Sequence, residues 1–134
     1  MKKGLIFFGV LITLTSCNKP DKKIKERINN ADSLAINYFK GDGTMDAVIA
    51  VKIVRDKKIM DQLISLISAS STMVNTKCGY DGSLHFFKKG VVVQDIDFRM
   101  NDAACMYFTF KQDGKTAATV LSSEAKKLLQ YINK

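Results

Sequence analysis

The sequence has little of the chemistry from which most active sites are built. Its 134 residues include no tryptophan, one proline and one histidine, His85. It contains no glycine-rich phosphate loop and no Gly-x-Ser-x-Gly motif, which excludes the usual nucleotide-binding and α/β-hydrolase arrangements. Its hydrophobic N-terminal stretch, Leu5–Ser16, covers twelve residues, whereas a membrane-spanning helix needs about twenty. These absences exclude several functional classes without indicating an activity.

The N-terminal segment has the parts of a secretory signal. Two lysines, Lys2 and Lys3, precede the hydrophobic stretch, which ends in Leu14-Thr15-Ser16-Cys17. These four residues resemble the lipobox of bacterial lipoproteins, in which a diacylglyceryl group is attached to the cysteine and signal peptidase II cuts before it. The resemblance implies that residues 1–16 are a cleaved signal peptide and that the mature chain begins at an acylated Cys17. A plain cleaved signal peptide is the alternative.

Acylation would place the protein on a membrane of the bacterial cell envelope. Two or more acyl chains give stable anchoring, so the lipid bilayer is the first expected partner, held through Cys17. Residues 17–21 then form the lipidated cysteine and a short tether. By the sorting rule of such lipoproteins, Asn18 after the cysteine favours the outer membrane over the cytoplasmic membrane.

The positive charge of the chain is spread rather than gathered into one stripe. Removal of Lys2 and Lys3 with the signal peptide lowers the formal net charge from +8 by two, to +6. The densest basic part, residues 19–27, lies beside the expected anchor, where cations are attracted to anionic headgroups. Nucleic-acid binding would need a basic face with interleaved aromatics. We therefore expect no nucleic-acid partner.

The two cysteines that remain after lipidation predict a disulfide. Cys78 and Cys105 would be exported to a compartment where disulfides persist. A meander of strands brings both residues to the same end of the sheet, close enough to bridge once the loop around Cys78 folds beneath the intervening strand. Two separate buried thiols, a metal site or a catalytic pair are the alternatives.

Hydrophobic periodicity predicts a helix, a strand and a second helix in the first half of the domain. Apolar residues recur at steps of three and four over residues 22–40, which is typical of an amphipathic helix. Alternation over residues 44–54 predicts a strand whose odd-numbered side chains face the core. The second helix is expected over residues 57–69, with Asp56 as its N-cap.

The second half of the chain predicts an antiparallel meander that ends in a helix. Two-residue turns are expected at Lys89-Gly90 and Asp113-Gly114, and Ser122 is the expected N-cap of the last helix. Strands are expected over residues 83–88, 91–100, 105–111 and 116–121, with Val92, Ile96, Phe98 and Met100 facing the core. The order α-β-α-β-β-β-β-α makes residues 22–134 a single α+β domain, in which helices pack on a four- to five-stranded antiparallel sheet.

The other face of this sheet carries the candidate partner-binding residues. Five side chains point out of the predicted core or lie in the loop before it: Tyr80, His85, Phe87, Tyr107 and Thr109. Exposed aromatic residues on an open sheet face are common in protein-binding surfaces. The alternative is that a helix covers this face and these residues form a second core layer.

A cysteine-based site can be drawn from the sequence but has little support. Cys78, Asp81 and His85 resemble the parts of a thiol-protease site, yet no family motif surrounds them. Zinc binding through Cys78, Cys105 and His85 lacks recognisable ligand spacing. We expect no metal and no other cofactor.

A carboxylate pair is the second chemical candidate. Asp95 and Asp97 share one face of a strand, as carboxylates for acid–base work or cation binding do. Arg99 continues the same row, and alternating charges are also typical of a solvated strand.

The sequence thus favours a non-catalytic binding module on a lipid anchor. An inhibitor, an immunity protein or an accessory subunit with an envelope protein as partner would fit, and we expect no enzyme. The predicted layering loosely resembles the modules of β-lactamase inhibitor proteins, in architecture alone. The alternative is an envelope hydrolase or small-ligand carrier that uses the surface carboxylates and His85.

Overall fold

The computed structural model describes residues 20–45, 47–74 and 76–134. The signal peptide and Cys17 lie outside the described residues, so their assignment stays a prediction. No described helix is long and apolar enough to cross a membrane.

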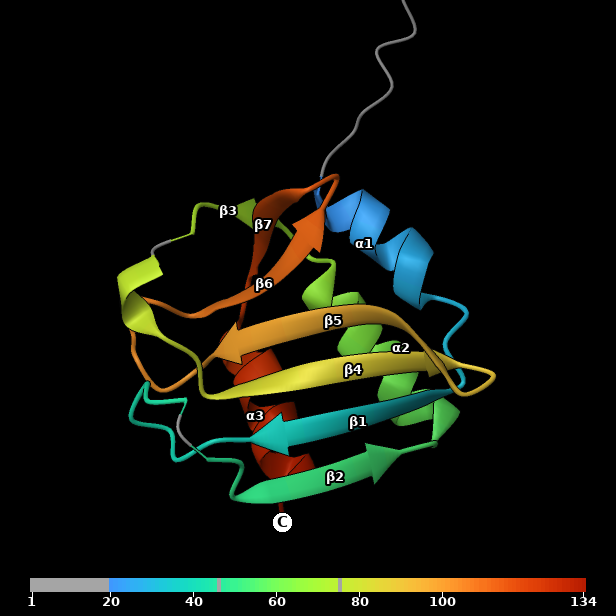
Figure 1. Ribbon diagram of the computed structural model, residues 1–134, viewed down its shortest axis with the longest axis horizontal. Helices are drawn as coiled ribbons and strands as arrows, with labels where there is room; N and C mark the ends of the chain where they lie inside the picture. The colour runs from blue at the N-terminus through green and yellow to red at the C-terminus, as the bar shows by residue number, and fades with distance from the viewer. Residues whose placement is uncertain (1–19, 46, 75) are drawn as a thin grey trace, which may run out of the picture.

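The described chain forms one antiparallel sheet with helices packed against it (Figure 1). The α+β class is therefore confirmed, but the sheet has seven strands, in the order β2-β1-β4-β5-β6-β7-β3, rather than four to five. The helices are α1 (Pro20–Ile28), α2 (Lys57–Ile67) and α3 (Ser123–Ile132), with a short 3-10 turn at Thr76–Cys78. The strands are β1 (Ser33–Tyr38), β2 (Ala50–Val54), β3 (Ser71–Thr72), β4 (Gly82–Lys88), β5 (Val91–Arg99), β6 (Tyr107–Gln112) and β7 (Lys115–Val120).

The helix predicted over residues 22–40 is wrong in its second half. The chain leaves α1 at Asn29-Asn30 and continues as β1, which pairs with β2 on one side and β4 on the other. Within β1 the buried residues alternate with less buried ones, and Leu34, Ile36 and Tyr38 face the core. Several apolar positions here fit both a helical and a strand period, and pairing with two neighbouring strands decides between them.

The strand predicted over residues 44–54 is shorter than expected and faces the other way. Val51 and Ile53 are 57% and 55% exposed, whereas Val54 is buried. The register explains this, because Val51 lies beside Asn37 and Ile53 beside Ala35, both on the side of β1 away from its buried residues. Cross-strand partners point to the same side of a sheet, so β2 turns its odd-numbered side chains outward.

The second half follows the predicted meander closely. Both tight turns are confirmed, with positive φ at Lys89-Gly90 and at Asp113-Gly114. The predicted N-caps are also confirmed: the Asp56 carboxylate accepts from two backbone N–H groups, and the Ser122 hydroxyl oxygen accepts from one. Val92 is a correction, because it is exposed rather than in the core. The register between β4 and β5 shifts between Phe86 and Phe87, which places Val92 beside the outward-facing Phe87.

The core lies between one face of the sheet and the three helices, and Ile24 and Ile28 of α1 are fully buried in it. Figure 1 shows α2 and α3 behind β1, β2, β4 and β5. Aromatic residues of three neighbouring strands, Phe86, Phe98 and Phe108, are fully buried in the core. Tyr38 joins the two layers, because its hydroxyl donates to the backbone carbonyl of Leu129 in α3 over 2.7 Å. We call this side of the sheet the inner face and the opposite side the outer face.

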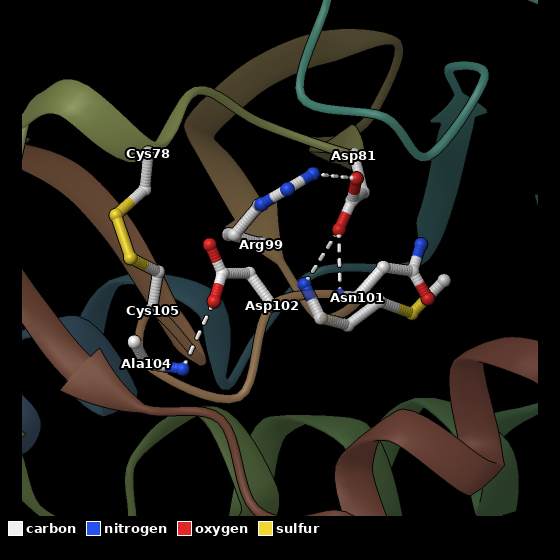
Figure 2. Close-up of a disulfide and its surroundings, with 8 residues drawn as sticks. Cys78, Asp81, Arg99, Asn101, Asp102, Ala104 and Cys105 are labelled. Atoms are coloured by element: carbon white, nitrogen blue, oxygen red, sulfur yellow. Dashed lines mark hydrogen bonds and ion pairs between the residues drawn. A yellow bond between two sulfur atoms is a disulfide. The ribbon is translucent and has the colours of Figure 1, made fainter.

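A buried carboxylate fixes the end of the sheet where β4 begins and β5 ends. Asp81 is 1% exposed, and one of its oxygens accepts from the guanidinium of Arg99 (Figure 2). The other oxygen accepts from the backbone N–H groups of Met100 and Asn101, over 2.7 and 2.9 Å. The carboxylate thus ties the start of β4 to the end of β5 and to the turn that follows β5.

Glycines let the backbone close around Asp81. A Cβ at Gly79, where φ is +64°, would lie 2.2 Å from the carbonyl oxygen of Gly43. A Cβ at Gly82 would lie 2.3 Å from the ring of Phe98. We call Gly43, Gly79, Gly82 and the Asp81–Arg99 pair the glycine corner.

The predicted disulfide between Cys78 and Cys105 is present, with the two Cα atoms 6.2 Å apart. It joins the segment before β4 to the segment before β6, next to the glycine corner (Figure 2). Closing this loop removes conformational freedom from the unfolded chain, which is worth roughly 3 to 4 kcal/mol on the chain-entropy model.

We expect Asp81→Ala to destabilise the fold far more than Asp56→Ala. The first substitution leaves the buried Arg99 guanidinium without its carboxylate, which costs about 3–5 kcal/mol. The second removes only an exposed helix cap, at about 1 kcal/mol. Urea unfolding of the full-length chain measures both. An equal or smaller loss for Asp81→Ala would show that the corner does not support the fold.

Candidate functional site

The outer face of the central strands is left uncovered by α2 and α3, which pack on the inner face (Figure 1). Its middle is polar. The register places Asn37 of β1 opposite Ser83 of β4, and His85 of β4 opposite Asp95 of β5. Ser83 and His85 are two residues apart on one strand, so their side chains share this face.

These four side chains form one hydrogen-bonded group centred on the imidazole of His85. Its Nδ1 lies 2.6 Å from a carboxylate oxygen of Asp95. Its Nε2 lies 3.0 Å from the Ser83 Oγ and 3.2 Å from the Asn37 Nδ2. We call Asn37, Ser83, His85 and Asp95 the histidine cluster.

The partners of His85 assign its protons when the ring is neutral. A carboxylate can only accept, so the proton is on Nδ1 and is donated to Asp95. The Nε2 lone pair then accepts from the Ser83 hydroxyl and the Asn37 amide. The cluster therefore holds the imidazole in one orientation and one tautomer, with its basic nitrogen aimed at a hydroxyl.

Asp97 lies beside the cluster in a different electrostatic setting. It pairs with Ser83 on one side and with Thr109 on the other. Burial raises the pKa of the Asp97 carboxyl, and the neighbouring Asp95 carboxylate raises it further, while His85 lowers it. The Asp97 carboxyl is thus harder to ionise than an ordinary exposed aspartate, and it lies next to Asp95, which is bonded to His85.

A hollow of about 600 Å³ adjoins this part of the outer face. Asp95 and Asp97 form one wall, and Tyr80 and Thr109 lie in its lining. Two basic residues, Arg27 of α1 and Lys111 of β6, also line the hollow. The hollow therefore offers both charges and a phenol hydroxyl to a small polar group.

The predicted partner-binding residues divide into two sets. Tyr80, His85 and Phe87 are partly exposed, so a contact role for them stays a prediction. Tyr107 and Thr109 point outward as predicted but are only 4% and 2% exposed, so the expectation that they are exposed is wrong. Burial raises the pKa of Tyr107, with Tyr80 and Arg99 among the groups that act on it. Tyr80, in the segment before β4, thus lies near Tyr107.

The thiol arrangement drawn from the sequence is not formed. Cys78 is bonded to Cys105, and the Asp81 carboxylate is bonded to Arg99, so neither is a partner of His85. Among the described residues, Cys78, Asp102 and Cys105 are the only group close enough to share a metal ion. Bridged sulfurs are not thiolate ligands, so this group does not fit zinc while the disulfide is intact.

Asp95, Asp97 and Arg99 share one face of β5, as predicted, but they have different bonding partners. Asp95 bonds to His85 and Arg99 to Asp81. Sequence reasoning missed Ser83 and Asn37 as members of a site. The available signal was the spacing of Ser83 and His85 on one strand face.

An apolar surface lies at the β2 edge of the sheet and was also missed. Its members are large hydrophobic residues that are each between 48% and 60% exposed: Met45, Val48, Ile49, Val51 and Ile53. We call them the apolar edge. Val51 and Ile53 share the outer face with Asn37 and Ala35, so the apolar edge borders the histidine cluster.

We expect Asp97→Asn and Asp95→Asn to change stability in opposite directions at pH 7. A carboxyl whose pKa is raised by folding loses stability as the pH rises through that pKa, so an uncharged amide at position 97 should raise the melting temperature. At pH 3, where the carboxyl is protonated, the gain should vanish. An amide at position 95 weakens the bond to His85 and should lower the melting temperature. Thermal unfolding of the full-length chain at both pH values measures this, and a stabilising Asp95→Asn would contradict the assigned bonding.

Comparison with known proteins does not assign this chain to a family: no family model, no curated protein and no solved structure matches it. The loose likeness to β-lactamase inhibitor modules therefore has no support from these comparisons, and the seven-stranded sheet differs from the four strands on which it was based.

Proposed function

We propose that this protein is a lipid-anchored lipoprotein of the bacterial cell envelope whose domain binds another envelope protein along the β2 edge of its sheet. The observation that carries the binding role is the apolar edge, five large hydrophobic side chains exposed within residues 45–53. Several large exposed apolar side chains gathered in one segment are typical of interaction sites rather than of a free surface.

The position of β2 supports docking of an extended segment. β2 ends the strand order and pairs with β1 on one side only among the described residues. Proteins usually protect such an edge with proline, a bulge or inward-pointing charge. β2 has one such charge, Lys52, which lies beside Ile36 of the inner face, but Val51 and Ile53 remain exposed on its outer face. A partner strand can therefore add to the sheet and pack against these two side chains.

A groove beside β2 supplies a pocket for a partner side chain. It has a volume of about 510 Å³, and Ile53, Val54, Ile59 and Tyr131 line it. Tyr131 is 64% exposed at the end of α3, which leaves its ring available for contact. A strand that pairs with β2 places alternate side chains toward this groove and toward the outer face.

Basic residues around the groove favour an acidic partner. Arg55 and Lys134 line it, and the one acidic residue there, Asp56, accepts from the N–H groups at the start of α2. With a net charge of +6 on the mature chain, a partner segment with apolar and acidic residues would be steered to this edge.

The binding role is tested by placing a photo-crosslinking amino acid at position 53 in cells that express the full-length chain. We expect one discrete adduct, because Ile53 lies between the outer face and the groove. Adding Val51→Lys should reduce the adduct at least tenfold, since a lysine there replaces buried apolar contact. Val91→Lys is the matched control, an exposed valine at the far end of β5, and should leave the adduct unchanged. Equal adducts in all three chains would refute docking at β2.

The anchor is tested separately by Cys17→Ser. A serine cannot carry the thioether-linked lipid, so signal peptidase II should not cut the chain, which should keep its signal peptide and lack the mass of the diacylglyceryl group. Mass spectrometry of the intact chain measures both effects. Unchanged cleavage before position 17 would leave the lipoprotein assignment without support.

A further inference from the structure

We propose that Ser83, His85 and Asp95 form a nucleophilic triad that hydrolyses carboxylic esters at the outer face of the sheet. This activity goes beyond the binding role proposed above and does not depend on it. It gives the hydrolase alternative a nucleophile that the sequence did not suggest.

The geometry matches what an activated serine needs. The Ser83 Oγ lies 3.0 Å from the His85 Nε2, and the His85 Nδ1 lies 2.6 Å from the Asp95 carboxylate. A carboxylate on one side of the ring keeps the proton on Nδ1, so the base for the serine proton is the Nε2 lone pair, which accepts from both the Ser83 hydroxyl and the Asn37 amide. Such triads are recognised by geometry and roles, not by order in the sequence or by fold.

The surroundings of the triad differ along its length. Ser83 is 7% exposed, and it lies between Asn37 and Asp97 in neighbouring strands. The side chain of His85 is 29% exposed and that of Asp95 is 69% exposed. Ser83 is thus shielded from bulk water, whereas the imidazole of His85 is open to the surface. The acyl carbon of an ester would therefore reach the Ser83 Oγ past the exposed edge of the His85 ring.

Asn37 is the group placed to stabilise the oxyanion. Ser83 lies in β4, which pairs with β1 on one side and with β5 on the other. The backbone N–H groups of β4 are therefore engaged in the sheet. A side chain must therefore donate to the developing charge. The Asn37 amide lies opposite Ser83 and has two N–H groups, of which one reaches the His85 Nε2. The second is available to a carbonyl oxygen bound at Ser83.

One side-chain donor favours an ester over an amide. An alkoxide leaves more readily than an amine anion, so an ester needs less stabilisation of its tetrahedral intermediate. Of the triad, only Asp95 lines the adjoining hollow of about 600 Å³. Its other polar lining residues, among them Arg27, Lys111 and Tyr80, suit the polar end of a small ester that reaches Ser83 from this side.

The reaction balances with water as the only co-reactant. His85 takes the proton of Ser83 as the Oγ–carbon bond forms and the carbonyl electrons move to oxygen. The tetrahedral intermediate then breaks its carbon–alkoxide bond, and His85 returns the proton to the departing alcohol. Water next gives a proton to His85 as its oxygen bonds to the acyl carbon. The second tetrahedral intermediate then breaks its Oγ–carbon bond, His85 returns the proton to the Ser83 Oγ, and the carboxylic acid leaves. Asp95 stays a carboxylate throughout.

The test uses the unmodified full-length chain in detergent and a fluorophosphonate probe, which forms a covalent bond only with an activated serine. We expect a single adduct, located on Ser83 by peptide mass mapping. No adduct on Ser83, or equal adducts on exposed serines such as Ser65, would overturn the proposal. Because no variant is needed, a folding defect cannot imitate either result.

Hydrolysis of p-nitrophenyl acetate supplies the second measurement. Ser83→Ala and His85→Gln should each lower the rate by about 10²-fold or more, the usual contribution of a general base. Asn37→Ala should lower kcat while labelling of Ser83 by the probe persists. Ser65→Ala is the control and should leave the rate unchanged. A rate unaffected by Ser83→Ala would overturn the assignment, whether or not a partner binds at β2.

Discussion

The bonding of Asp81 is the interaction on which the rest of the structure depends. A carboxylate that is 1% exposed is tolerated only because a guanidinium and two backbone N–H groups surround it. In the same segment the backbone N–H of Asp81 donates to the carbonyl of Phe98, and its carbonyl accepts from the N–H of Phe39. One residue therefore sets where β1 ends, where β4 begins and how β5 leaves the sheet. The histidine cluster lies on these three strands, so its short distances rest on this corner.

Two surfaces of different chemistry share the outer face. The apolar edge at β2 suits a partner that adds a strand, and the histidine cluster on β1, β4 and β5 suits a small polar ligand. They are neighbours because β1 pairs with both β2 and β4. A partner seated on β2 would therefore lie next to Asn37 and limit the approach to Ser83. Partner binding at β2 and ester hydrolysis at Ser83 thus use different residues, but they lie on neighbouring strands, so one can affect the other.

An element was predictable from the sequence when the residues that determine it lie close together along the chain. The turns at Lys89-Gly90 and Asp113-Gly114 and the caps at Asp56 and Ser122 were predictable, because residues within a few positions of each other decide them. The fold class followed from these elements. The residues of β1 also fit a helical period, and only strands that are distant in the sequence bury them as a strand. The buried face of β2 could not be predicted, because both of its faces carry apolar residues.

The site was less predictable for a local reason. A regular hairpin around Lys89-Gly90 that pairs Phe87 with Val92 would place Gln94 opposite His85. The extra residue of the bulge instead pairs Phe86 with Gln94 and His85 with Asp95. A shift of one residue thus gives the imidazole a carboxylate and turns Gln94 to the buried side. No periodicity in the sequence indicates that bulge, so Asp95 and Ser83 could not be joined through His85 in advance.

The glycine corner also provides a means of recognising relatives of this chain. Gly79 and Gly82 have no room for a Cβ atom, and Asp81 and Arg99 are each buried against the other. A chain that builds the same corner has to place glycine, aspartate and glycine at the spacing of residues 79, 81 and 82, with an arginine at the end of the second strand that follows, as Arg99 ends β5. It would also need a cysteine just before the first glycine if the bridge to Cys105 is retained. Such a pattern is short, and it is independent of the surface residues that set the ligand and the partner. Similarity searches weighted on these positions can detect homologues whose remaining sequence has diverged.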